Sequence, residues 1–199
     1  GKICFYCEGR DWIMSKNKKV AISSISPRQD DVFMLDTNIL IKILYPAMND
    51  RKIAPYENLY AKLLSAKSKL LISSVQISEF INRCIRFQFA LYTGSDGNEK
   101  LDFKKDYRST DDYKNSMTAI LDIINSDIIP NYIFIDDGFS KMQNEKIFRY
   151  GFSYDFNDSL LLEIASQNNA MLVTDDRDFA NYASDVKIIT NNKALLMFS

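Results

Sequence analysis

VFMLDTNILIKIL, at residues 32–44, contains the change of pattern from which the fold class follows. Residues 32–35 are four apolar side chains in a row, which is typical of a short strand that is buried on both faces. The run ends at Asp36, and an apolar helical pattern then extends over residues 39–44 and stops near Pro46. A buried strand that leads directly into a helix predicts a parallel sheet covered by helices.

The same alternation continues along the chain. Four further apolar runs have the length of buried strands, at residues 70–72, 132–135, 170–173 and 186–189. Helical patterns lie between them, at about residues 56–66, 75–91, 112–125 and 139–148 and from residue 155 onward. The alternation predicts an α/β fold, a three-layer α/β/α sandwich with a central parallel sheet of about five strands. We assign residues 32–199 to this domain, residues 1–31 to an N-terminal extension, and residues 93–128 to a helical insertion.

The composition narrows the chemistry that the chain can carry out. No histidine occurs, which excludes serine–histidine hydrolysis, histidine-based ribonuclease chemistry and histidine-ligated zinc. Three cysteines do not form a disulfide framework, and Cys4 and Cys7 lack the further ligands of a structural zinc site. No apolar run is long enough to cross a membrane, and no signal-peptide pattern is present. We therefore expect a cytoplasmic protein without a membrane partner.

Acidic residues gather where the predicted strands end. Asp36 follows the first strand, and Glu79 lies in the helix after the second. Asp175 and Asp176 follow the fourth strand, and Asp158 lies in the first turn of the helix before it. Because ligands of an open parallel sheet bind beyond the carboxyl ends of its strands, we expect one shared site. A cation would offset the repulsion between these carboxylates, and oxygen ligands alone suit Mg²⁺ or Mn²⁺.

Each acid also has a local structural interpretation. Asp36 could cap the helix that follows it, and Glu79 could pair with Arg83 four residues further on. Asp155 and Asp158 could be the N-cap and the third residue of their helix. The acids after the fourth strand could be ordinary turn residues. The convergence of all of them on one edge favours a shared site over these separate roles.

Four segments resemble, in chain order, the motifs of the PIN-domain family. LDTNIL at residues 35–40 resembles the opening motif, and ISEF at residues 77–80 resembles the second acidic segment. NDSL at residues 157–160 resembles the third, and LVTDDRDF at residues 172–179 resembles the fourth. The resemblance covers about residues 32–190, and four motifs in the right order are much more specific than any one of them.

The resemblance implies an endoribonuclease that cleaves single-stranded RNA with Mg²⁺ or Mn²⁺. A water activated by the metal would attack the phosphodiester and leave 5′-phosphate and 3′-hydroxyl ends. Many small bacterial members are toxins silenced by a protein antitoxin, and members often form homodimers, so both partners are expected. The stretch between Glu79 and Asp158 is longer than in the compact toxins. The catalytic and metal-binding quartet then corresponds to Asp36, Glu79, Asp158 and Asp176, with Asp178 as a further metal ligand.

Further residues take supporting roles in the same comparison. Thr37 and Asn38 would orient the first carboxylate and Thr174 the last, while Asp155 is a weaker supporting candidate. RNA phosphates would be met at the rim of the cleft by Arg83 and Arg86.

A basic run in the insertion is a second candidate for RNA binding. Lys104, Lys105 and Arg108 lie close in sequence to Phe103 and Tyr107. Basic residues with interleaved aromatic residues can bind single strands through charge and stacking. A solvated loop is the alternative interpretation, and it is favoured.

Three other functions compete with the nuclease. A metal-dependent phosphatase or nucleotide-binding switch would suit the same sheet, but the first strand lacks an Asp-x-Asp pair and the chain has no G-x-x-x-x-G-K-[ST] loop. A catalytically idle PIN-like module would bind RNA or protein without cutting. A structural protein would carry the acidic edge by accident. The net charge of −1 argues only against a general nucleic-acid coat.

Overall fold

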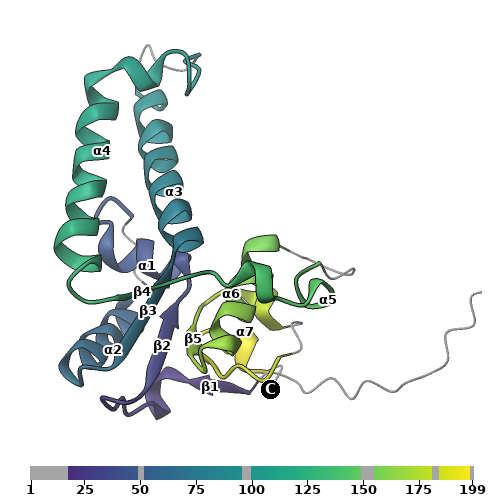
Figure 1. Ribbon diagram of the computed structural model, residues 1–199. Helices are drawn as coiled ribbons and strands as arrows, with labels where there is room; N and C mark the ends of the chain where they lie inside the picture. Colours follow the sequence, from purple (N-terminus) through teal and green to yellow (C-terminus); the bar gives the residue numbers. More distant parts are fainter. Residues whose placement is uncertain (1–17, 49–51, 96–99, 149–154, 181–183, 198–199) are drawn as a thin grey trace, which may run out of the picture.

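Six parallel strands form a single sheet in the computed structural model, which describes residues 18–48, 52–95, 100–148, 155–180 and 184–197 (Figure 1). Their spatial order is β1-β6-β5-β2-β3-β4. The α/β fold with a parallel sheet is thereby confirmed, while the pair Cys4 and Cys7 lies outside the described residues. The strands are β1 (Lys19–Ala21), β2 (Val32–Leu35), β3 (Lys69–Ser73), β4 (Ile133–Ile135), β5 (Met171–Val173) and β6 (Ile188–Thr190).

The strand β1 was not predicted from the sequence. It pairs with β6, so that Lys19 lies opposite Ile188 and Ala21 opposite Thr190. An edge strand of three residues has one neighbour and needs no long apolar run, which explains why the sequence gives no clear sign of it. The sheet therefore has six strands where about five were expected, and the sixth comes from the segment assigned to the N-terminal extension.

Helices cover both faces of the sheet, because successive strand residues point to opposite sides. Phe33 and Leu35 of β2 belong to one apolar core, and Met34 between them belongs to the other. Figure 1 shows the helices of the first core to one side of the sheet and those of the second core to the other. The first core contains α1 (Thr37–Leu44), α2 (Ala54–Ser65) and α3 (Ser74–Thr93), and the second contains α5 (Asn144–Ile147), α6 (Phe156–Gln167) and α7 (Lys193–Leu196).

Shorter helical turns complete the chain between these elements. The helix expected at residues 139–148 is two pieces, η4 and α5, with a break at Met142 and Gln143. None of the described helices has the length and apolarity to cross a membrane. The short turns are η1 (Ile22–Ser24), η2 (Tyr107–Ser109), η3 (Ile124–Ile128), η4 (Phe139–Lys141) and η5 (Arg177–Ala180).

The predicted insertion contains η2, α4 (Asp111–Ile123) and η3, and α4 packs along α3. Figure 1 shows the two helices side by side, projecting beyond the sheet. An aromatic cluster joins them: the ring of Tyr107 lies 5.0 Å from that of Phe89 and 5.8 Å from that of Phe103. Tyr107 is completely buried and its hydroxyl donates to Asp112 at 2.6 Å. Phe103 is also buried, so neither ring is free to stack on RNA bases, and this part of the sequence interpretation is wrong.

Replacing Tyr107 tests this structural role. Tyr107→Ala should lower the free energy of unfolding by roughly 3–5 kcal/mol, because it removes a fully buried ring. Tyr107→Phe keeps the ring and should cost only about 1 kcal/mol for the missing hydrogen bond to Asp112. Urea denaturation measures both values. A decrease below about 1 kcal/mol for Tyr107→Ala would contradict the packing of the insertion against α3.

Candidate metal centre

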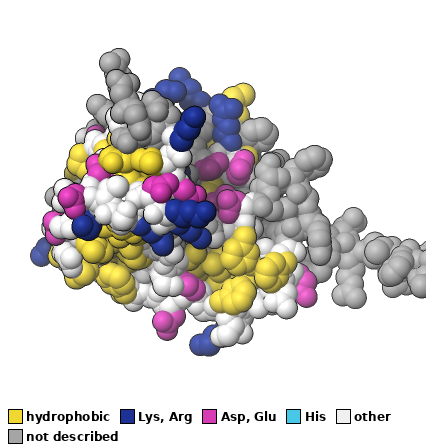
Figure 2. Space-filling view, turned by 90° about the horizontal axis from the view of Figure 1, so that it is seen from above, with side chains coloured by type: hydrophobic (Ala, Val, Ile, Leu, Met, Phe, Trp, Pro, Cys, Tyr) yellow, Lys and Arg dark blue, Asp and Glu magenta, His cyan; other side chains and the backbone are white. Residues whose placement is uncertain are grey.

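The carboxyl ends of β2, β3 and β5 bring acidic side chains to one edge of the sheet. Asp36 directly follows β2, Glu79 lies in the second turn of α3 after β3, and Asp176 follows β5. Asp158 comes from the first turn of α6 in the helical layer. Figure 2 shows acidic side chains gathered on the face seen from above, with lysine and arginine side chains beside them.

Asp36 is the most deeply buried of these acids, with 4% of its surface exposed. It caps α1, and its Oδ1 accepts a hydrogen bond from the backbone N–H of Asn38 at 3.3 Å. Its Oδ2 accepts from the hydroxyl of Thr174 at 2.7 Å. Burial raises the pKa of Asp36 to about 6, and the charges of Asp176 and Glu79 add to this effect. The cap that the sequence offered as an alternative therefore exists, and it holds an acid whose ionisation is opposed by its surroundings.

Thr174 links the first and last acidic segments. Its hydroxyl donates to Asp36 and accepts from the backbone N–H of Asp176 at 3.0 Å. Oδ1 of Asp176 in turn accepts from the backbone N–H of Asp178 at 2.9 Å. Thr174 is completely buried, so this arrangement is fixed by the sheet rather than by a mobile loop. Thr174 was expected to orient the carboxylate of Asp176; its hydroxyl instead contacts the carboxylate of Asp36 and only the backbone of Asp176.

Glu79 is oriented by two neighbours. The hydroxyl of Thr37 donates to its Oε2 at 3.0 Å, and Nη1 of Arg83 donates to its Oε1 at 3.3 Å. The prediction that Thr37 orients Asp36 is therefore wrong, because the first turn of α1 directs this hydroxyl toward α3. Asn38 contacts Asp36 through its backbone N–H, which almost any residue could supply.

The buried Gln76 fixes α3, and with it Glu79, against the end of β2. Its Nε2 donates to the carbonyl of Leu35 at 2.7 Å, and its Oε1 accepts from the backbone N–H of Ser73 at 3.2 Å. Sequence reasoning missed this residue, although the spacing of Ser73 and Gln76 matches a capping box.

Asp158, Asp176 and Asp178 form the tightest group of acids. One oxygen atom of each lies within 4.8 Å of the others, which is close enough for a single cation to contact all three. Burial raises the pKa of Asp158 to about 8, and the charges of Asp36, Asp155, Asp176 and Glu79 raise it further. A divalent cation with oxygen ligands fits this donor set, since its charge would offset both the burial and the mutual repulsion that raise the pKa of Asp158.

Asp155 caps α6 and adds charge to the site. Its Oδ1 accepts from the backbone N–H of Asn157 at 2.8 Å, and its side chain is exposed. Its influence on the pKa of Asp158 is electrostatic. The helix cap is therefore observed directly, while a supporting role of Asp155 at the site stays a prediction.

The two arginines proposed for RNA binding have different surroundings. Arg83 is partly exposed and lies against Glu79 at the rim of the acidic group. The guanidinium of Arg86 lies 3.9 Å above the centre of the Phe103 ring, so it faces the insertion. Lys104 and Lys105 are exposed, and their backbone N–H groups donate to Asp102. The structure thus keeps Arg83 beside the site and places Arg86 with the aromatic cluster.

Comparison with known proteins gives one family. Residues 33–185, more than half of the chain, match the family model described as PIN domain. No curated protein matches the chain.

Two solved structures are similar to this chain with a TM-score of 0.46 each. One is a chain in the crystal structure of VapBC2 from Rickettsia felis, which is bound to a DNA fragment from the promoter of VapBC2. The two sequences are 20% identical, and the match covers 80% of this chain and 98% of that chain. The other is PAE2754 from Pyrobaculum aerophilum, with 14% identity over 85% of this chain and 90% of that chain.

The raised pKa of Asp158 predicts how the metal-free protein responds to pH. The folded-state pKa of about 8 lies above the ordinary value of 3.8, so the folded state binds this proton more tightly. The stabilisation of the folded protein by this bound proton is complete below the ordinary pKa of Asp158 and is lost as the pH rises through the folded-state pKa. Asp158→Asn cannot ionise and should melt above the wild type by an amount that grows between pH 4 and pH 9. The increase should be roughly 2–4 °C for each kcal/mol that burial and repulsion of the ionised carboxylate cost the wild type. Thermal melts in EDTA measure it, and a difference that stays constant with pH would contradict the arrangement.

Proposed function

The chain belongs to the PIN-domain family, whose members are generally nucleases, and we propose that it cleaves single-stranded RNA with the help of a divalent cation. The observation that carries this proposal is the convergence of Asp158, Asp176 and Asp178 within 4.8 Å, beside the buried carboxyl of Asp36. Three chain segments deliver these acids to the edge of the sheet where ligands of parallel sheets bind. Such an arrangement costs stability without a cation and therefore favours a functional role over an accidental one.

Oxygen donors determine the class of cation. Carboxylates without histidine or cysteine suit Mg²⁺ or Mn²⁺. When bound, such a cation supplies an activated water and stabilises the charge that develops on the phosphate. The buried Cys84 takes no part, because burial raises the pKa of its thiol to about 12.

The side chains of the chain divide the remaining work. Asp36 and Glu79 are each held by two hydrogen bonds, so their carboxylates are aimed before substrate arrives. Because its pKa is raised to about 8, Asp158 would have to give up a proton to hold a cation at neutral pH, so we expect cation affinity to rise with pH. Arg83 lies beside Glu79 and is partly exposed, which supports the proposal that it contacts a phosphate of the strand.

The acids of the candidate site are the first residues to replace. Asp36→Asn should lower the rate of RNA cleavage by more than about 100-fold, because it removes a charge from the donor set at little change in size. The matched control is Asp122→Asn on α4, an exposed acid outside the site, which should cleave like the wild type. The assay follows a mixed pool of single-stranded RNA with Mn²⁺, Mg²⁺ or EDTA.

The outcomes separate the competing functions. Cleavage that needs the cation and is abolished in Asp36→Asn supports the nuclease. A folded protein that binds Mn²⁺ and RNA but cuts nothing would instead be the catalytically idle module.

The chemical form of the product ends tests the attacking group. We expect 5′-phosphate and 3′-hydroxyl ends, which arise when water attacks the phosphodiester. Labelling of the 5′ ends with and without prior phosphatase treatment identifies them. Products with 2′,3′-cyclic phosphates would contradict the mechanism, since they require attack by the neighbouring 2′-hydroxyl.

An antitoxin and a homodimer, which the family resemblance implies, stay predictions.

A further inference from the structure

A cavity lies next to the acidic group that Asp158, Asp176 and Asp178 form, and we refer to this cavity as the lysine pocket. It has a volume of about 670 Å³ and lies between α1, α2, the turn after β5 and the start of α7. Four of the residues that line it are cationic and one is acidic, so its charge is opposite to that of the neighbouring site. These residues are Lys42, Lys52, Arg177, Lys193 and Asp175.

The turn after β5 forms the wall between the two sites. Asp175 lines the lysine pocket, while the next residue, Asp176, belongs to the acidic group. Consecutive Cα atoms are about 3.8 Å apart, so a ligand that fills the pocket lies within a few residue lengths of the acids. One flexible chain carrying several charges can therefore contact both sites at the same time.

The wall is fixed by hydrogen bonds from three elements. Nζ of Lys42 contacts Oδ2 of Asp175 at 2.6 Å, and Nδ2 of Asn192 donates to the Asp175 carbonyl at 2.7 Å. The hydroxyl of the buried Tyr56 donates to the Thr174 carbonyl at 3.4 Å, at the start of this turn, and accepts from the backbone N–H of Asn191 after β6 at 2.9 Å. The lysine pocket is thus a built feature that joins α1, α2 and the ends of β5 and β6.

The charge in the lysine pocket indicates an anionic ligand. Lys52, Arg177 and Lys193 are exposed, and they lie around the cavity where a phosphate would gain from each of them. The helix α2 begins at the same place, with Pro55 in its first turn and no side-chain cap on its N-terminus. The partial positive charge of a helix N-terminus adds to the attraction for an anion.

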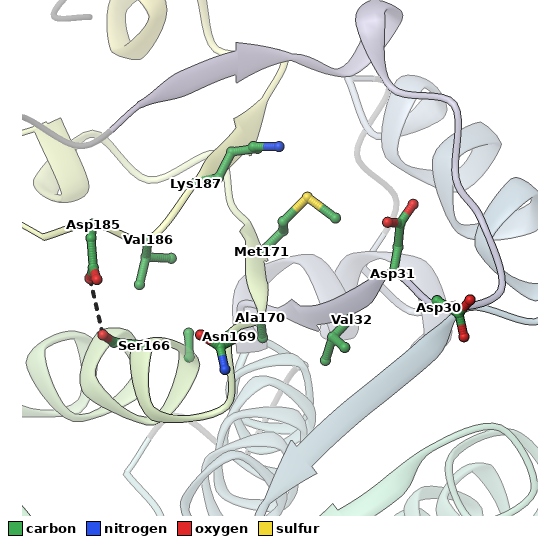
Figure 3. Close-up of a pocket in the computed structure, with 11 residues that line it drawn as sticks. Asp30, Asp31, Val32, Ser166, Asn169, Ala170, Met171, Asp185, Val186 and Lys187 are labelled. Carbon is green, nitrogen blue, oxygen red and sulfur yellow. Dashed lines mark hydrogen bonds between the residues drawn. The ribbon is translucent and has the colours of Figure 1, made fainter.

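The cavity drawn in Figure 3 differs from the lysine pocket in the charge of its lining. It lies at the opposite, amino edge of the sheet and has a volume of about 470 Å³. Its lining includes Asp30, Asp31 and Asp185 but a single cation, Lys187. Oδ1 of Asp185 accepts a hydrogen bond from the hydroxyl of Ser166 at 3.0 Å, drawn as a dashed line in Figure 3. Such a lining repels phosphate.

We propose that the lysine pocket binds a backbone phosphate of the same nucleic-acid strand whose neighbouring phosphodiester lies at the acidic group. The proposal rests on the proposed function, because the acids alone would repel a strand and need an adjacent cationic surface to retain it. It also sets the path of the strand: from Arg83 beside Glu79, across the acids, to the pocket beyond Asp175.

The test measures binding separately from cleavage. A fluorescein-labelled single-stranded RNA of mixed sequence is titrated with the full chain in EDTA, over a range of KCl concentrations. The double variant Lys52→Gln/Lys193→Gln should bind this RNA more weakly, because the pocket loses two of its cations. For each phosphate contact that is lost, we expect the affinity in 0.1 M salt to fall roughly fivefold. The slope of log affinity against log salt concentration should become shallower by about 0.7 for the same lost contact. The matched control is Lys62→Gln/Lys69→Gln, two exposed lysines that do not line the pocket, which should keep the wild-type slope.

Each outcome decides the proposal. A reduced slope in the first double variant alone, with an unchanged melting temperature and a raised KM at similar kcat, supports it. Equal slopes in both double variants overturn the proposal. It is also overturned if Lys52→Gln/Lys193→Gln binds inorganic phosphate more weakly but binds RNA as the wild type does, since the pocket would then be a site for a free anion. Because binding is measured without cation, a wild type that binds RNA through the pocket but does not cut it would refute only the proposed cleavage.

Discussion

The carboxyl group of Asp36 is buried at the carboxyl edge of a parallel sheet, among other acids, and the rest of the site depends on how that burial is tolerated. Burying a charged carboxylate is costly unless hydrogen bonds or an opposite charge compensate for it. Thr174 and the first turn of α1 supply the hydrogen bonds. The neighbouring acids add repulsion instead of relief, so the carboxyl group is compensated either by a proton, as its raised pKa indicates, or by an opposite charge. A bound cation is the simplest source of that charge.

The same constraint explains why the site is rigid. Asp36, Glu79 and Asp176 come from three different strand ends, and each is held by a hydrogen bond with another residue of the site. Gln76 ties α3 to the end of β2, and Tyr56 ties α2 to the ends of β5 and β6. Because these hydrogen bonds are buried or partly buried, the acids keep their positions despite repelling one another. The turn after β5 then faces the acids on one side and the lysine pocket on the other.

The sequence predicted the layers of the fold and the place of the acids for one physical reason. Strands buried on both faces are short apolar runs, and at the end of β2 the run stops at the residue that faces the site, Asp36. Features set by contacts between distant segments were not visible. Nothing local indicates that β1 would pair with β6, that Thr37 would reach Glu79, or that Tyr107 would be buried inside the insertion. The lysine pocket is of the same kind, since its cations come from four separate segments.

Calorimetric titration of the metal-free protein with Mn²⁺ tests whether the acids form a metal centre. At pH 7, in two buffers with different ionisation enthalpies, we expect binding that releases protons, because Asp158, with a pKa of about 8, must ionise to accept a cation. Asp176→Asn should weaken binding strongly. A folded wild-type protein that binds no Mn²⁺, or binds it equally well after that substitution, would show that the acids do not form a metal centre.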